Sequence, residues 1–231
     1  GAIHSFSFHN YVTLFTTPEL IDMIIGSIAL AIGSAVLATI LGTTGAIGAF
    51  YSKKNVNGTM SVLNQIPVVN ADVVTGFSLC ILLVVVFGVS KNTYIPLVIG
   101  HTVLSAPFVY LAVVPKLKQM DPSLYEAALD LGATPGYTLI HIIIPQIASG
   151  IISGFVMAVT LSLDDYFVAT YTKPATFDTI STYVVNATKG SQTNIRTALW
   201  ALSTIIFLIV VIVEVVMNFA PIKNEAQKEK H

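Results

Sequence analysis

Charged side chains are scarce in this sequence. Only 10% of its 231 residues are Asp, Glu, Lys or Arg, whereas 54% are hydrophobic. A soluble chain of this length would carry about a quarter charged residues. The net charge of −1 gives no indication of nucleic-acid binding, and the single cysteine, Cys80, lies in an apolar run and cannot form an intrachain disulfide. The composition therefore predicts an integral membrane protein.

Segments of about ten residues with alternating polarity, which are typical of membrane β-barrels, are also absent. The sequence instead contains long apolar runs, and these reach the roughly 20 residues needed to cross a bilayer as a helix. We therefore predict an all-α fold with five membrane helices, at residues 20–50, 66–89, 94–115, 138–166 and 196–219. The first of them contains the small-residue pairs Ala38/Gly42 and Gly45/Ala49, which favour close packing against another helix.

The distribution of basic residues predicts the orientation. Cytoplasmic loops carry an excess of Lys and Arg, and with five spans one side of the membrane receives Lys53, Lys54, Lys116, Lys118, Lys223, Lys228 and Lys230. Lys91, Lys173, Lys189 and Arg196 fall on the other side in longer loops. We expect an extracytoplasmic segment at 1–19, a membrane domain at 20–219 with a cytoplasmic loop at 116–137, and a cytoplasmic tail at 220–231. Because residue 1 is Gly and no signal peptide precedes this outside segment, we also expect a first helix upstream.

A polar island interrupts the apolar runs at "MDPSLYEAALDLGATP". Asp121 can cap a helix, Pro122 suits its first turn, and Gly132 suits a left-handed residue at its end. The sequence predicts a short helix here. Taken alone, these signals fit a capped linker helix at the membrane surface as well as a helix that enters a groove on another protein.

The island resembles a known signature. Glu126-Ala127-Ala128, three residues, Gly132, nine residues and then Ile142-Ile143-Ile144-Pro145 is similar to the EAA motif of permease subunits of ABC importers, with Ile144 where Leu is usual. The resemblance implies a type I ABC importer permease fold without its customary first helix. It also implies that Glu126, Ala127, Ala128, Gly132 and Pro145 belong to a coupling loop that docks on an ATPase subunit. No GxxxxGK[ST] loop is present, so ATP and Mg would be bound by that partner and the chain itself would need no cofactor.

We single out four acidic residues within the predicted spans: Asp72, Asp164, Asp165 and Glu214. Intramembrane carboxylates are costly and are candidates for functional sites. Glu214 lies near a span end and can reach water, whereas Asp164 and Asp165 repel each other and can both stay ionised only near solvent or a cation. With no Lys or Arg in the interior of a span, these residues favour a cation site. The alternative is that the pair only caps the outer end of its helix.

Within the importer permeases, "NADVV" in the second span and "SLDD" after "MAVTL" look most like the spermidine/putrescine permeases of the PotC type. That resemblance implies a polyamine pathway with contributions from Asp72, Ser162, Asp164, Asp165 and Tyr11, although an interfacial aromatic role explains Tyr11 equally well. It also implies a multi-pass protein of a bacterial inner membrane. Its partners would be a second permease subunit, two ATP-binding subunits and an extracytoplasmic substrate-binding protein, with no nucleic acid.

Other functions stay open at this point. An importer of another cation, such as an amino acid or iron, needs the same acidic residues, and a secondary cation transporter could use them as ion sites, although no inverted repeat is visible. A membrane enzyme would need a nucleophile with a base, or a metal cluster, and we find neither spacing. His101 and His141 each stand alone in the sequence, which favours packing or interfacial roles over metal binding.

Overall fold

The computed structural model describes residues 16–189, 202–205, 207–208 and 211–212. In these ranges every regular element is a helix, as the composition predicts, and no strand occurs there. The chain divides into two compact units. One comprises Ser27–Phe177, and the other comprises Gly1–Gly26 together with Asp178–His231.

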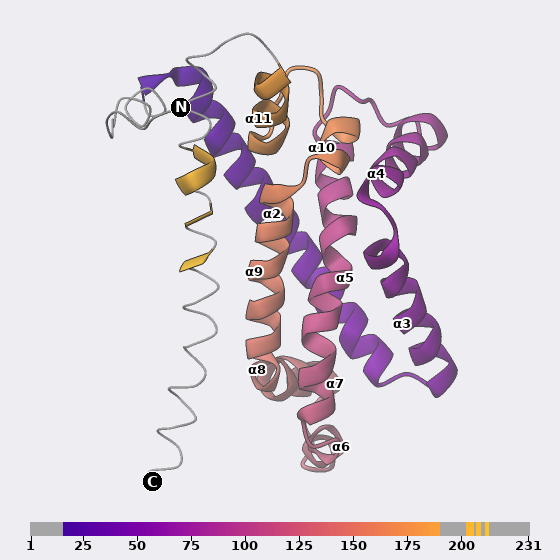
Figure 1. Cartoon of the computed structure of the whole chain (residues 1–231). Helices are drawn as coiled ribbons and strands as arrows, with labels where there is room; N and C mark the ends of the chain where they lie inside the picture. The colour runs from indigo at the N-terminus through magenta and orange to yellow at the C-terminus, as the bar shows by residue number, and fades with distance from the viewer. Residues whose placement is uncertain (1–15, 190–201, 206, 209–210, 213–231) are drawn as a thin grey trace. The chain divides into compact units, whose positions relative to one another are not determined.

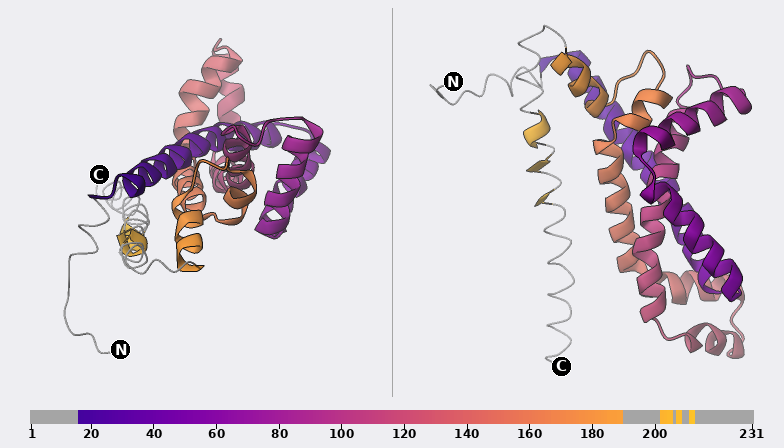
Figure 2. Two further views of the ribbon diagram at one scale, coloured as in Figure 1. Left: turned by 90° about the horizontal axis from the view of Figure 1, so that it is seen from above. Right: turned by 45° about the vertical axis from the view of Figure 1, so that its right-hand side comes forward.

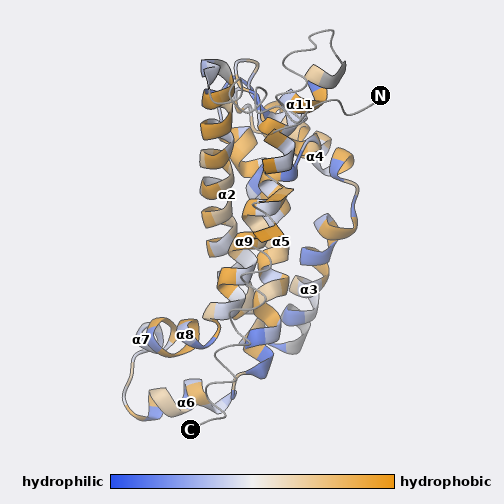
Figure 3. Cartoon of the chain, turned by 60° about the vertical axis from the view of Figure 1, so that its left-hand side comes forward, coloured by the Kyte–Doolittle hydropathy of each residue, from blue (hydrophilic) through white to orange (hydrophobic). Residues whose placement is uncertain are grey.

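Among the described residues, two helices are each long and apolar enough to cross a membrane. They are α2 (Pro18–Phe50) and α5 (Ile95–Gln119), and they confirm the helices predicted at 20–50 and 94–115. Most of α2 is hydrophobic (Figure 3). The predicted end of α5 was four residues too early, because Lys116 and Lys118 form its last turn, where cations interact favourably with the helix dipole.

The span predicted at 66–89 is broken by a sharp bend and begins earlier in the chain. Helix α3 (Lys54–Val69) begins well before it, and α4 (Asp72–Cys80) follows after a bend of 104°, continued by the π-helical turn η1 (Ile81–Val86). The bend is visible between the purple helices in Figure 2. Asn70 and Ala71 adopt extended backbone conformations that end α3. Asp72 in the first turn of α4 favours a new helix, because its negative charge interacts favourably with the positive N-terminal end of the helix dipole.

The predicted span at 138–166 is also bent. It begins three residues earlier with α7 (Pro135–Thr138), continues through the π-helical turn η2 (Leu139–Ile143) and α8 (Ile144–Gln146), and turns by 72° before α9 (Ala148–Asp164). Pro145 cannot donate a backbone hydrogen bond, which favours a break near this point. The apolar run in this segment therefore does not form a single straight helix.

Small residues let α5 pack closely against α2 and α9 in the larger unit. A Cβ atom on Gly42 of α2 would lie 2.7 Å from Val109 Cβ, and one on Gly154 of α9 would lie 3.0 Å from Val109 Cα. Ala38 and Ala49 are buried on the same helix as Gly42. The small-residue pattern in the sequence thus marks a real helix contact, and α5 and α9 lie side by side (Figure 1).

Within the larger unit, a short helix, α10 (Phe167–Thr172), packs against α4 and α5. Val168 lies against two glycines: a Cβ on Gly76 would be 2.8 Å from Val168 Cα, and a Cβ on Gly100 would be 2.8 Å from Val168 Cγ1. These contacts fix the connection between α9 and α10. At the other end of α5 lies α6 (Ser123–Asp130) (Figure 1).

The smaller unit contains the first turns of α2, the helix α11 (Ile180–Lys189) and helical residues at 202–205, 207–208 and 211–212. Leu20, Met23, Ile180 and Leu202 form its apolar cluster. The rest of the helix predicted at 196–219, with Glu214, lies outside the described residues.

Candidate functional site

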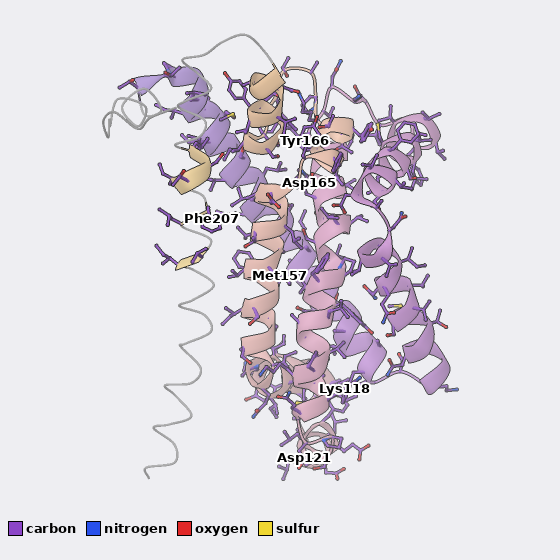
Figure 4. The ribbon with its side chains drawn as sticks, viewed as in Figure 1. Lys118, Asp121, Met157, Asp165, Tyr166 and Phe207 are labelled. Atoms are coloured by element: carbon purple, nitrogen blue, oxygen red, sulfur yellow. The ribbon has the colours of Figure 1, made fainter. Side chains whose placement is uncertain are left out.

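Three predicted carboxylates line one cavity in the larger unit. Asp72 comes from the start of α4, whereas Asp164 and Asp165 come from the end of α9. The cavity measures about 420 Å³ and is lined by Pro67, Val68, Asp72, Leu104, Phe108, Leu161, Asp164, Asp165, Tyr166 and Phe167. This volume is typical of a small-molecule site. Asp165 and Tyr166 lie at the end of α9 remote from Lys118 and Asp121 (Figure 4).

The carboxylates differ in exposure. Asp72 and Asp164 are exposed, whereas Asp165 is only 8% exposed. The Asp165 carboxylate accepts hydrogen bonds from the backbone N–H groups of Val168 (3.2 Å) and Ala169 (2.8 Å). Asp165 therefore caps the start of α10, the helix that follows the acidic pair.

Ser162 lies behind the cavity in a buried polar group. Its Oγ is 2.8 Å from His101 Nδ1 and 3.3 Å from Ser34 Oγ. His101 Nε2 lies 3.7 Å from Asp165 Oδ2 and has no hydrogen-bond partner within the described part of the chain. Thus the structure brings Ser162 together with Asp165, although Ser162 itself is buried and does not line the cavity.

Sequence reasoning missed His101 and Ser34. They lie 61 and 128 residues from Ser162 along the chain, so no local spacing could connect them. One available signal was that each is a polar residue inside an apolar helix, which is costly unless it has a partner. Tyr11 lies outside the described residues.

The arrangement is suited to binding a cation. Its lining includes three carboxylates and no Lys or Arg, and Tyr166 adds an aromatic ring to the wall. Carboxylates form charge-assisted hydrogen bonds with ammonium groups, and aromatic faces attract cations. Among the described residues, no group of three His, Cys, Asp or Glu side chains is placed to hold a metal ion.

The remote helix α6 has the ends that the sequence predicts. Asp121 accepts hydrogen bonds from the backbone N–H (2.9 Å) and the Oγ–H (2.8 Å) of Ser123, and both lower the pKa of the Asp121 carboxyl. Gly132 ends the segment with a φ of +87°, a conformation that glycine adopts without steric cost.

The faces of α6 are distinct. Ala128 is buried, and Leu124 and Tyr125 pack against the main apolar core. The Tyr125 ring lies 4.9 Å from that of Tyr51, measured between centroids. Among the motif residues, Glu126, Ala127, Gly132 and Pro145 are exposed, and Leu131 next to them is 90% exposed. Of the two motif alanines, only Ala127 lies on the exposed face of α6, because Ala128 faces the protein interior.

Comparisons with known proteins agree with this architecture. The chain is 30% identical over 223 residues to the spermidine/putrescine transport system permease protein PotC of Haemophilus influenzae, covering 95% of this chain and 83% of that protein. It is 34% identical over 151 residues to the putrescine transport system permease protein PotI of Escherichia coli K12, covering 63% of this chain and 53% of that one. These relatives are permease proteins rather than enzymes.

Solved ABC transporters share the fold. A bacterial transporter involved in import of the acidic polysaccharide alginate matches with a TM-score of 0.70 and 18% identity, covering 94% of this chain and 85% of that chain. An amino acid ABC transporter solved with histidines matches with a TM-score of 0.63 and 17% identity, covering 93% and 97%. The family described as binding-protein-dependent transport system inner membrane component matches residues 42–220. This chain is a membrane permease that belongs to that family.

Proposed function

We propose that this chain is a permease subunit of an ATP-driven polyamine importer and that Asp72, Asp164 and Asp165 form part of the pathway. The observation that carries this proposal is the cavity lined by three carboxylates without a Lys or Arg. Of the solved structures with this fold, one is a transporter involved in import of an acidic polysaccharide and another is an amino acid transporter, so the charge of this cavity is a better guide to cargo than the fold is.

Polyamines match the cavity chemically. They are flexible chains that carry two or more ammonium groups separated by methylene spacers. Separated carboxylates can pair with separate ammonium groups, while Phe108, Phe167 and Tyr166 in the wall can contact the methylenes and offer aromatic faces. The names of the PotC and PotI relatives support the same cargo class. Ser162 contributes from behind the wall, and Tyr11 is proposed as an aromatic contact.

Energy would enter at α6. Glu126, Ala127, Gly132 and Leu131 form an exposed surface that we assign to docking on an ATP-binding partner, while Leu124 and Tyr125 hold the helix to the core. Pro145 lies exposed in α8, beyond the π-helical turn that follows α7. A push on α6 could therefore reach both α5 and α9, since α6 lies between them in the chain. ATP and Mg would be bound by that partner.

The proposed assembly contains a second permease subunit, two ATP-binding subunits and an extracytoplasmic binding protein. In the larger unit Lys53 follows α2, while Lys116 and Lys118 end α5 near α6. This clustering supports a cytoplasmic position for α6 in a bacterial inner membrane. The acidic cavity, at the other end of α9 (Figure 4), would then face the outer half of the membrane, toward the binding protein.

The test is ATP-dependent uptake by the complete complex in proteoliposomes. Labelled spermidine and putrescine should accumulate, and unlabelled polyamine should compete, whereas a neutral polyol should not. Accumulation of a cationic amino acid but no polyamine would reassign the cargo to another cation. Uptake driven by an ion gradient without ATP would contradict the importer and favour a secondary transporter.

A further inference from the structure

A buried chain of polar side chains runs behind the acidic cavity, from Ser34 through Ser162 to His101. We propose that His101 is a positioning residue that holds Asp165 in place, so that Asp165 is a fixed part of the wall while Asp72 and Asp164 contact the cargo. This inference rests on the proposed function, and it divides the three carboxylates into two roles.

The direction of the hydrogen bonds supports this role. Ser34 Oγ lies 2.8 Å from the Leu30 carbonyl, to which it can donate, and 3.3 Å from Ser162 Oγ. If Ser162 Oγ–H donates to His101 Nδ1, the neutral ring carries its proton on Nε2, which faces Asp165 Oδ2 at 3.7 Å. The other tautomer would turn a lone pair toward a carboxylate. The negative charge of Asp165 therefore selects the tautomer whose N–H faces it.

His101 acts through Asp165 because it cannot reach the cargo itself. Its side chain is fully buried, and it is absent from the residues that line the cavity. A cation in the cavity would meet Asp72 and Asp164 first, since both are exposed. The Asp165 oxygens already accept two backbone N–H groups at the start of α10.

Packing fixes the same carboxylate from the other side. Val168, three residues after Asp165, lies against Gly76 of α4 and Gly100 of α5. Gly100 precedes His101, and Gly76 lies one helical turn after Asp72 in α4. The position of Asp165 relative to His101 and Asp72 is therefore fixed by these packing contacts. Loss of the His101 contact should displace the Asp165 side chain in the cavity wall without removing its charge.

The first experiment is a double-mutant cycle on spermidine uptake by the complete complex. We expect His101→Asn, which can keep a polar atom near Nδ1 but none near Nε2, to raise KM about tenfold, because the buried Asp165 carboxylate loses the polar group that faces it at 3.7 Å. His101→Gln, whose longer amide can reach toward Asp165, should recover most of the affinity. KM should change more than the maximal rate, and the amount of assembled complex in the membrane controls for folding.

Coupling energies then separate the roles. His101→Asn combined with Asp165→Asn should be strongly non-additive in KM, whereas His101→Asn combined with Asp72→Asn should be close to additive. Additivity between His101 and Asp165 would overturn the proposal. Equal KM for His101→Asn and His101→Gln would also overturn it, because the contact near Nε2 would then be irrelevant.

A second experiment does not depend on the cargo. In a Cys80→Ser background, a cationic thiol reagent should modify Asp72→Cys and Asp164→Cys at least tenfold faster than Asp165→Cys. Comparable rates at all three positions would overturn the division into exposed and fixed carboxylates. If the rates differ as expected but spermidine protects neither exposed cysteine, the polyamine proposal fails while the division into exposed and fixed carboxylates stands.

Discussion

The two ends of the larger unit are built in opposite ways. The α6 end is local: Asp121 bonds to Ser123, two residues away, and Gly132 closes the same segment. The acidic end is assembled from α2, α4, α5 and α9, with polar contacts that join residues 61 and 128 positions apart. A segment with local contacts can keep its shape when a partner moves it, whereas a site shared among four helices responds to the arrangement of all of them.

The largest expected effect is at the acidic end. We predict that Asp72→Asn combined with Asp164→Asn raises the KM for spermidine by about 100-fold or more. Two interactions with charged groups are lost, each worth about 1.5–3 kcal/mol. Association with the ATP-binding subunits, measured by co-purification, should not change. Asp130→Asn, at the exposed carboxylate of α6, is the matched control, and an equal rise in KM for that variant would show that the two ends are not separate.

The next effect is expected at the end of α6. Gly132→Ala should lower polyamine-stimulated ATPase activity about tenfold, because a non-glycine residue at a left-handed position costs about 1–2 kcal/mol and would displace the loop from its docking geometry. Gly136→Ala is a suitable control, since Gly136 has no positive φ and no atom near its Cβ position. If both variants lose activity equally, the conformation at Gly132 does not explain the loss.

A smaller effect is expected for the exposed charge on α6. Glu126→Lys should reduce stimulated ATPase activity about threefold to tenfold while leaving the KM for spermidine unchanged, because exposed ion pairs are worth about 1 kcal/mol or less and a charge reversal adds repulsion. Kinetics of the reconstituted complex measure both quantities. A change in KM without a change in ATPase activity would contradict the assignment of Glu126 to the surface that docks on the ATP-binding partner.

The smallest effect is expected at Asp121. Asp121→Asn should change stimulated ATPase activity by less than about twofold, since Asn and Asp are similar helix caps, and Asp121→Ala should have the larger effect. Because Ser123 lowers the pKa of the Asp121 carboxyl in the folded protein, its contribution is present above the unfolded pKa and is lost only as pH falls through the folded pKa. ATPase profiles of wild type and Asp121→Asn should thus have the same shape near neutral pH.

The same contrast explains what the sequence could predict. Asp121 and Gly132 predicted the ends of α6 because helix caps depend on neighbouring residues, and composition predicted α2 and α5. The bends at Asn70 and Ile147 were missed because a long apolar run indicates that a segment can be buried in a membrane but does not indicate where its helix axis changes direction. Asp72, Asp164 and Asp165 were predicted as charges inside spans, but the burial of Asp165 and its contact with His101 depend on packing between distant helices.

Val168 occupies a space that exists because residues 76 and 100 have no side chain. An alanine at position 100 would place a methyl group 2.8 Å from Val168 Cγ1, so a smaller residue at 168 could accommodate it, whereas an alanine at position 76 would lie 2.8 Å from Val168 Cα and would require α10 to move. Positions 100 and 168 should therefore change together among related chains, with a larger residue at one accompanied by a smaller residue at the other, while position 76 should stay glycine. Such covariation would indicate that close packing of α10 against its neighbouring helices is maintained in related chains.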